Sequence, residues 1–171
     1  MHGARVVVVE RPGDHAGEEA DAAVTATPGC VLAVQVADCA PVALVSDDVV
    51  GVVHAGWRGV LAGVVPATVA AMRALGAVEI RALIGPCIHA ECYEFGADDL
   101  ERIAALLGDE VRATTSSGTP ALDVVAAVRA SLDRADVTDI DVVDVCTACS
   151  HEHWSFRATA DAQRQAVVAW M

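Results

Sequence analysis

Lysine is absent from this 171-residue sequence, so all 11 basic residues are arginine. The absence of lysine excludes catalysis through a lysine Schiff base and a phosphate-binding loop of the GK[ST] kind. Basic charge is scarce as well, because 24 acidic residues give the chain a net charge of −13 at pH 7. An acidic chain without a basic cluster argues against nucleic acid as a partner.

Long apolar runs are also missing, although 54% of the residues are hydrophobic. No run reaches the roughly 18 apolar residues that span a membrane, and no charged segment followed by an apolar one suggests an export signal. We therefore expect a cytoplasmic protein without a membrane partner. The 6 cysteines are expected to be reduced thiols, because a chain of this length and hydrophobicity buries a core without disulfides.

The stretch VLAVQVADCAPVALVSDDVVGVVHAGWRG organises the chain and reads as three strands. If its second and third strands are joined by a two-residue turn on Asp47 and Asp48, His54 lies opposite Pro41. Cys39 then points to the same face of the sheet as His54, because side chains alternate with period two. Diagonal neighbours of this type lie about 7–8 Å apart at Cα, so a thiolate and an imidazole can reach one common atom.

Several interpretations of this pair remain open. Cys39 and His54 can hold a metal together with further ligands, or they can act as nucleophile and base in a metal-free hydrolase. A non-catalytic domain that binds a metal or a partner is a third possibility. The simplest alternative is a buried cysteine beside a histidine at the end of a strand, with no function.

Four segments carry a resemblance to a known family: VADCAPVAL, VVHAGWRG, IGPCIHAECYEFG and CTACSHEHWSFR. The combination of ADCxP with HAGWRG resembles the laccase-domain family of multicopper polyphenol oxidases. Members of this family are also described as purine nucleoside phosphorylases with adenosine deaminase activity. The similarity covers nearly the whole chain, and it implies one zinc or copper ion held by His2, Cys39 and His54.

The resemblance implies a zinc-dependent enzyme whose substrates are purine nucleosides and phosphate. Zinc with three protein ligands keeps a fourth position for water and activates it near neutral pH. The implied reactions are phosphorolysis of nucleosides such as adenosine, inosine and guanosine, and deamination of adenosine. A copper-dependent polyphenol oxidase (laccase) is the alternative. The 6 histidines contain one H-x-H pair, at 151 and 153, which is too few for a full multicopper centre.

Other candidate residues surround the predicted ligands. Arg58 follows His54 closely, and its guanidinium suits phosphate, so we predict a catalytic and substrate-binding role, with a surface salt bridge as the alternative. The resemblance points to Tyr93, Glu94 and Arg157 as residues that bind substrate. Asp21 is expected either to cap or line the pocket or to be a solvated loop acid.

The cysteine-rich segments allow two further interpretations. His89 and Glu91, followed by Cys146 and Cys149, match the H-x-E and C-x-x-C order of zinc deaminases. The C-x-x-C pair with the histidines that follow it also resembles a zinc knuckle. In the family this segment is Cys-Thr, a variable loop and then Ser-aromatic-Arg. We therefore interpret the second cysteine and both histidines as loop residues, and Cys92 as a packing residue.

The elements predict an α+β fold of the three-layer α/β/β type in one domain, residues 1–171. About eight short strands and about three helices are expected, the helices at 60–75, 97–107 and 121–135. Family members usually carry strands and a Ser-x-Arg-x-Gly-Gly pocket loop ahead of the position that matches His2. We therefore expect a domain that is short at its N-terminus.

Overall fold

The strands β4 (Ala40–Val45) and β5 (Val50–Ala55) form the middle of a six-stranded sheet with the order β1-β2-β5-β4-β6-β9. Val45 is the only residue of β4 that is not buried, and His54 the only one of β5. Strands buried on both faces need a covering layer on each side. The computed structural model describes residues 2–171, and its remaining strands in this sheet are β1 (Val6–Val8), β2 (Ala22–Thr25), β6 (Arg81–Ile84) and β9 (Asp139–Val142).

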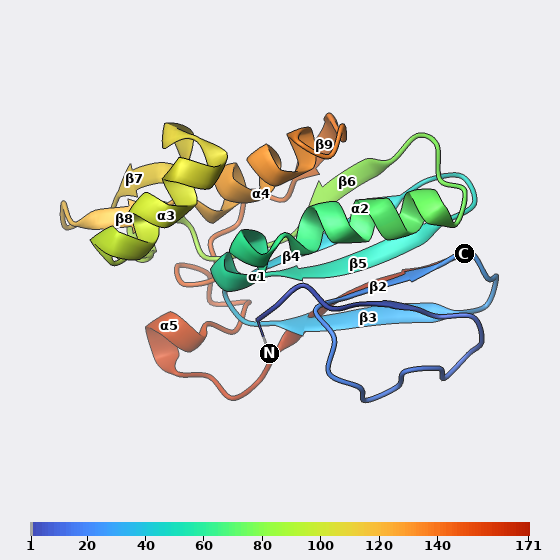
Figure 1. The fold of residues 1–171 in the computed structure, drawn as a ribbon. Coiled ribbons are helices and arrows are strands. Elements are labelled where there is room, and N and C mark those ends of the chain that lie inside the picture. The colour runs from blue at the N-terminus through green and yellow to red at the C-terminus, as the bar shows by residue number, and fades with distance from the viewer. Residues whose placement is uncertain (1) are drawn as a thin grey trace.

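Helices cover one face of this sheet, and a two-stranded sheet covers the other (Figure 1). The antiparallel pair β3 (Val31–Val36) and β10 (Gln165–Trp170) packs its inner side chains against the middle of the six-stranded sheet. β3 alternates strictly between exposed and buried residues, the pattern of a strand with one solvated face. The predicted α+β fold with three layers, α/β/β, is therefore confirmed.

The helical layer contains α1 (Trp57–Ala62), α2 (Val64–Ala74) and α4 (Val124–Asp133). The longest helices of residues 2–171 have 11 residues, and none of the helices described is long and apolar enough to cross a membrane. Beside this layer lie α3 (Ala97–Leu107), the hairpin of β7 (Arg112–Thr114) and β8 (Pro120–Leu122), and the short helices η1 (Ala90–Cys92) and η2 (Asp109–Val111). The short helix α5 (Phe156–Thr159) lies apart from it, at the level of β3 in Figure 1.

The helix predicted at 60–75 is two helices, and this part of the prediction is wrong. Gly63 separates α1 from α2 with φ of 83°, a left-handed conformation that favours glycine. Pro66 lies in the first turn of α2, where its missing N–H costs little, so it does not kink the helix. The predicted helix end at residue 75 agrees with the C-cap Leu75 of α2, which is followed by Gly76 with φ of 104°.

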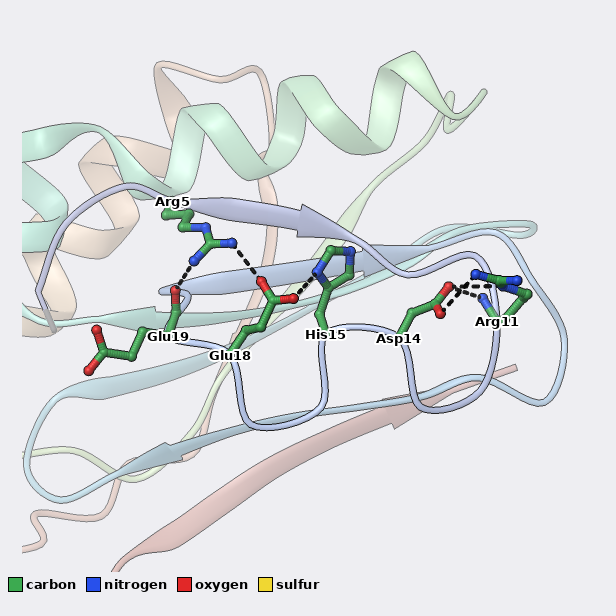
Figure 2. A network of polar contacts seen from close by, with 6 residues as sticks. All are labelled: Arg5, Arg11, Asp14, His15, Glu18 and Glu19. Atoms are coloured by element: carbon green, nitrogen blue, oxygen red, sulfur yellow. Dashed lines mark hydrogen bonds and ion pairs between the residues drawn. The ribbon is translucent and has the colours of Figure 1, made fainter.

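An exposed polar loop lies between β1 and β2 (Figure 2). The Arg5 guanidinium donates to the Glu19 carbonyl at 2.7 Å and pairs with the Glu18 carboxylate at 2.7 Å. His15 is exposed, and its Nδ1 lies 3.1 Å from Glu18. Exposed pairs of this kind stabilise a fold by at most about 1 kcal/mol each, so the loop needs a buried anchor as well.

We predict that Asp123→Ala destabilises the helical layer. The Asp123 side chain is the N-cap of α4 and accepts a hydrogen bond from the Ala126 N–H at 2.8 Å. Loss of such a cap costs about 1 kcal/mol, which lowers Tm by about 2–4 °C in a chain of this length. Thermal unfolding followed by circular dichroism measures the shift.

Asp98→Ala is the matched control, because Asp98 is an exposed acid in the first turn of α3 and is not its cap. The substitution removes only the favourable interaction of this carboxylate with the helix dipole. We therefore expect the free energy of unfolding to fall by about a few tenths of a kcal/mol. Equal shifts for the two variants would contradict the capping role of Asp123.

Candidate metal centre and its cavity

The register of the β4–β5 hairpin is the predicted one. Pro41 pairs with His54, and the Ser46 N–H donates to the Val49 carbonyl at 2.9 Å, which leaves Asp47 and Asp48 as the turn. His54 is thereby fixed one residue before the end of β5.

Cys39 lies directly before β4, after a residue with unusual backbone geometry. Asp38 has φ of 76°, which turns the chain sharply into the strand. Both oxygens of its buried carboxylate accept hydrogen bonds, from the Thr147 hydroxyl and the Arg157 N–H, each at 2.7 Å. Asp38 is not among the residues predicted from the sequence. Its only signal was an acid next to the predicted cysteine ligand.

Asp21 anchors the segment that carries His2. Its carboxylate is buried and accepts from the Gly3 N–H at 2.9 Å and from the Arg5 N–H at 3.3 Å. The Asp21 carbonyl accepts from the His54 N–H at 2.8 Å. One residue therefore holds the backbone next to His2 and the backbone of His54. The interpretation of Asp21 as a solvated loop acid is wrong, because its carboxylate is buried and accepts two backbone hydrogen bonds.

The side chains of His2, Cys39 and His54 converge. Their ligand atoms all lie within 4.8 Å of one another, and the two imidazole rings meet edge to face with centroids 5.1 Å apart. Gly56 makes room for them: a methyl group there would lie 2.9 Å from both the Cys39 sulfur and the His2 ring. Two imidazole nitrogens and one sulfur suit zinc or copper, so this set of donors fits the implied ion.

Burial sets the protonation of the two inner side chains. It raises the pKa of Cys39 to about 11, with a further contribution from the Asp38 carboxylate. It lowers the pKa of His54 to about 4, with a further contribution from His2. A Cys–His hydrolase uses a thiolate with a low pKa beside its base. A thiol with a raised pKa beside a neutral imidazole does not match that pair, whereas neutral imidazole is the form that binds metals.

A cavity of about 550 Å³ opens over the three side chains. This volume lies within the range of small-molecule binding sites. Arg58, Arg157 and Arg164 line it, and Asp38 is the only acidic residue among the described residues of its wall. Three arginines against one aspartate give the wall a net positive charge in a strongly acidic chain.

Aromatic rings position two of these arginines. The Arg58 guanidinium lies 4.0 Å from the centroid of the Trp57 ring, and the Arg157 guanidinium lies 4.9 Å from that of Tyr93. Such stacking holds a cation in place and leaves its N–H groups free to bind an anion. Trp57 and Tyr93 line the same cavity, together with Phe156.

One predicted substrate-binding residue, Glu94, and the histidine pair interpreted above as loop residues both lie elsewhere. Glu94 is exposed, is not among the residues that line the cavity, and forms an isolated backbone bridge with Ala121. His151 and His153 line a different cavity that shares no residue with this one. The only H-x-H pair of the chain therefore lies apart from the three converging ligands.

Comparison with known sequences identifies the family. A family described as multi-copper polyphenol oxidoreductase laccase matches residues 1–171. A purine nucleoside phosphorylase of Streptomyces coelicolor is 45% identical over 177 residues, covering 100% of this chain and 72% of that protein. An adenosine deaminase from an unknown prokaryotic organism is 34% identical over 167 residues, covering 88% of this chain and 64% of that protein.

Solved structures show the same fold. The hypothetical protein YfiH of Bacillus licheniformis superposes with a TM-score of 0.87 at 28% identity, covering 98% of this chain and 70% of that one. YlmD of Geobacillus stearothermophilus superposes with a TM-score of 0.85 at 30% identity, covering 99% of this chain and 70% of that one. The arrangement of layers described above is therefore shared by these two bacterial proteins.

We predict that Gly56→Ala weakens metal binding by about 10–100-fold, since the added methyl group displaces Cys39 and His2. Gly56 has φ of −78°, so alanine fits the backbone and the effect is confined to the ligands. Zinc affinity measured by competition with a chromophoric chelator tests the prediction.

Gly96→Ala is the matched control. Gly96 is also an N-cap glycine in extended conformation, with φ of −65°, and a methyl group there meets nothing within 4 Å. Its zinc affinity should equal that of the unmodified protein. An unchanged affinity in Gly56→Ala would contradict the convergence of the ligands.

Proposed function

We propose that this chain, which belongs to the family described as multi-copper polyphenol oxidoreductase laccase, is a zinc-dependent purine nucleoside enzyme. The proposed reactions are phosphorolysis of purine nucleosides and deamination of adenosine. The observation that carries the proposal is the convergence of His2, Cys39 and His54 beneath a cavity lined by arginines. The names of the relatives, purine nucleoside phosphorylase and adenosine deaminase, supply the substrate class.

The three converging side chains are the proposed ligands. When bound, zinc with three protein ligands supplies a Lewis acid and lowers the pKa of water toward 7. His54 is already neutral and available to a metal, and Cys39 gives up its proton when it binds. The Asp21 anchor holds His2 in reach of the other two, so the site depends on a residue that does not itself face the cavity.

The cavity wall provides matching groups for a nucleoside and for phosphate. A purine ring stacks favourably on aromatic side chains such as Trp57, Tyr93 and Phe156. The three guanidiniums of the wall are suited to phosphate, which they bind through pairs of N–H groups. Burial raises the pKa of Tyr93 to about 12, so its hydroxyl keeps its proton and serves as a hydrogen-bond donor on the wall.

In the proposed phosphorolysis, a phosphate oxygen attacks C1′ of the nucleoside and the bond from C1′ to the purine nitrogen breaks. The products are ribose 1-phosphate and the free base, which takes up a proton. Arg58 and Arg157 hold the phosphate dianion next to the sugar and offset its charge as the bond forms. Deamination replaces the amino group of adenosine by oxygen from water and releases ammonia, so it needs no phosphate.

A copper-dependent polyphenol oxidase is the second candidate, favoured by the description of the family. Multicopper oxidation needs several copper ions, each with its own histidines. Among residues 2–171 one cluster of metal-binding side chains contains histidine, and it contains two. This donor set provides for one ion, which supports a nucleoside enzyme more than a multicopper oxidase.

The test is incubation of the zinc-loaded protein with adenosine, with and without phosphate. We expect inosine from deamination in both cases, and adenine or hypoxanthine with ribose 1-phosphate only when phosphate is present. Cys39→Ser should abolish both reactions. Absence of turnover by zinc-loaded protein, together with phenol oxidation by copper-loaded protein, would replace the proposal with the oxidase.

We predict that Arg58→Met separates the two reactions. Loss of a charge-assisted hydrogen bond costs about 1.5–3 kcal/mol, so kcat/KM for phosphate should fall by about 10–100-fold. Deamination of adenosine should change by less than about threefold, because phosphate takes no part in it. Arg129→Met is the control, since Arg129 is exposed on α4 outside the cavity. Equal losses in both reactions would contradict a phosphate-binding role for Arg58.

A further inference from the structure

A second group of metal-binding side chains lies outside the ligand set described above. Glu91, Cys92, Cys146 and Cys149, here called the thiol cluster, present ligand atoms that all lie within 4.8 Å of one another. The Cys92 and Cys149 sulfurs are 3.2 Å apart, and the Cys149 sulfur is 3.9 Å from a Glu91 oxygen. Ligands at about 2.3 Å from a tetrahedral zinc ion are separated by about 3.8 Å, which is close to this spacing.

The thiol cluster joins two distant segments of the chain. Glu91 and Cys92 belong to η1, whereas Cys149 lies 57 positions after Cys92 in the turn that follows β9. Backbone hydrogen bonds align the segments: the Cys87 N–H donates to the Val145 carbonyl at 3.3 Å, and the Thr147 N–H donates to the Cys87 carbonyl at 3.0 Å. These hydrogen bonds hold the two segments side by side, which places the cysteines of the thiol cluster close together.

One backbone group already donates to a sulfur of the thiol cluster. The His89 N–H donates to the Cys146 sulfur at 3.3 Å, and Cys146 itself is buried. Hydrogen bonds from the surrounding protein orient metal ligands and stabilise the charge of thiolates. The imidazole of His89 is not part of the set, and Cys92 takes its place, so the ligands differ from the H-x-E and C-x-x-C order predicted for a zinc deaminase.

We propose that the thiol cluster is a second metal site, which binds zinc and stabilises the wall of the cavity. Three sulfurs and one carboxylate oxygen suit a thiophilic ion such as zinc and not magnesium or calcium, which prefer oxygen ligands. Four protein ligands close the coordination sphere, which is the arrangement of a structural site. The ligands His2, Cys39 and His54, by contrast, leave one position open.

The position of the thiol cluster gives it a structural role. Cys92 directly precedes Tyr93, which lines the cavity. On the other segment, Thr147 follows Cys146 and donates to Asp38, whose neighbour is Cys39. A zinc ion in the thiol cluster therefore fixes two parts of the cavity wall relative to each other. This proposal does not rest on nucleoside chemistry, because zinc binding is measured without substrate.

The experiment is metal analysis of protein loaded with zinc under reducing conditions and freed of excess metal. We expect about two zinc ions per chain in the unmodified protein and about one in either Cys149→Ser or Cys39→Ser. The double variant should hold none. Cys30→Ala is the control: it removes a buried thiol outside the thiol cluster and should keep about two. One zinc ion in both the unmodified protein and Cys149→Ser would overturn the proposal.

Cobalt substitution provides a second readout in the same proteins. With three thiolate ligands, Cys39→Ser loaded with cobalt should keep strong sulfur-to-cobalt charge-transfer absorption, and Cys149→Ser should lose most of it. A chelator should lower the Tm of Cys39→Ser and leave that of the double variant unchanged. A Cys92–Cys149 disulfide that forms in air despite stoichiometric zinc would overturn the proposal in favour of a redox pair.

Discussion

The pairing of β4 with β5 is the constraint on which the candidate metal centre depends. The two strands are buried on both faces, so a shift of one residue in register would move each side chain into the opposite core, where its size does not fit the packing. The register that satisfies both faces sets Pro41 against His54 and leaves Cys39 at the entrance of β4. The packing of the core thus fixes the positions of two candidate ligands.

Two buried carboxylates hold the segments around this hairpin in the positions that form the candidate metal centre. Asp21 and Asp38 each accept hydrogen bonds with both oxygens, and each connects segments that are far apart in the sequence. Asp21 connects the segment of His2 to β5, and Asp38 connects the entrance of β4 to the C-terminal part of the chain. A buried carboxylate is costly unless it is hydrogen-bonded, so each pattern of donors stabilises one arrangement of the surrounding loops.

The distribution of charge follows from the same arrangement. The chain carries a net charge of −13, but three arginines line the cavity, and its described wall contains one acid, Asp38. The local field therefore differs in sign from that of the whole molecule and attracts an anion to the candidate ligands. Stacking on Trp57 and Tyr93 holds two of the arginines in place without acidic partners.

The sequence by itself determined the features that depend on local patterns. Strand alternation and the Asp47–Asp48 turn gave the hairpin register, helical spacing gave the bounds of α3, and the alternation of strands and helices gave the fold class. The resemblance to a family supplied His2, whose neighbours in the sequence show no periodicity. The break at Gly63 was missed, because an apolar helical pattern runs on across a left-handed glycine.

Only the tertiary structure decided which distant residues meet. The burial of Asp21 and Asp38, the exclusion of Glu94 from the cavity and the assembly of the thiol cluster all result from packing between segments many residues apart. Sequence spacing carries no information on such contacts, since they depend on how whole layers dock. Cys149 was interpreted as a loop residue and Cys92 as a packing residue for this reason, although folding places their sulfurs 3.2 Å apart.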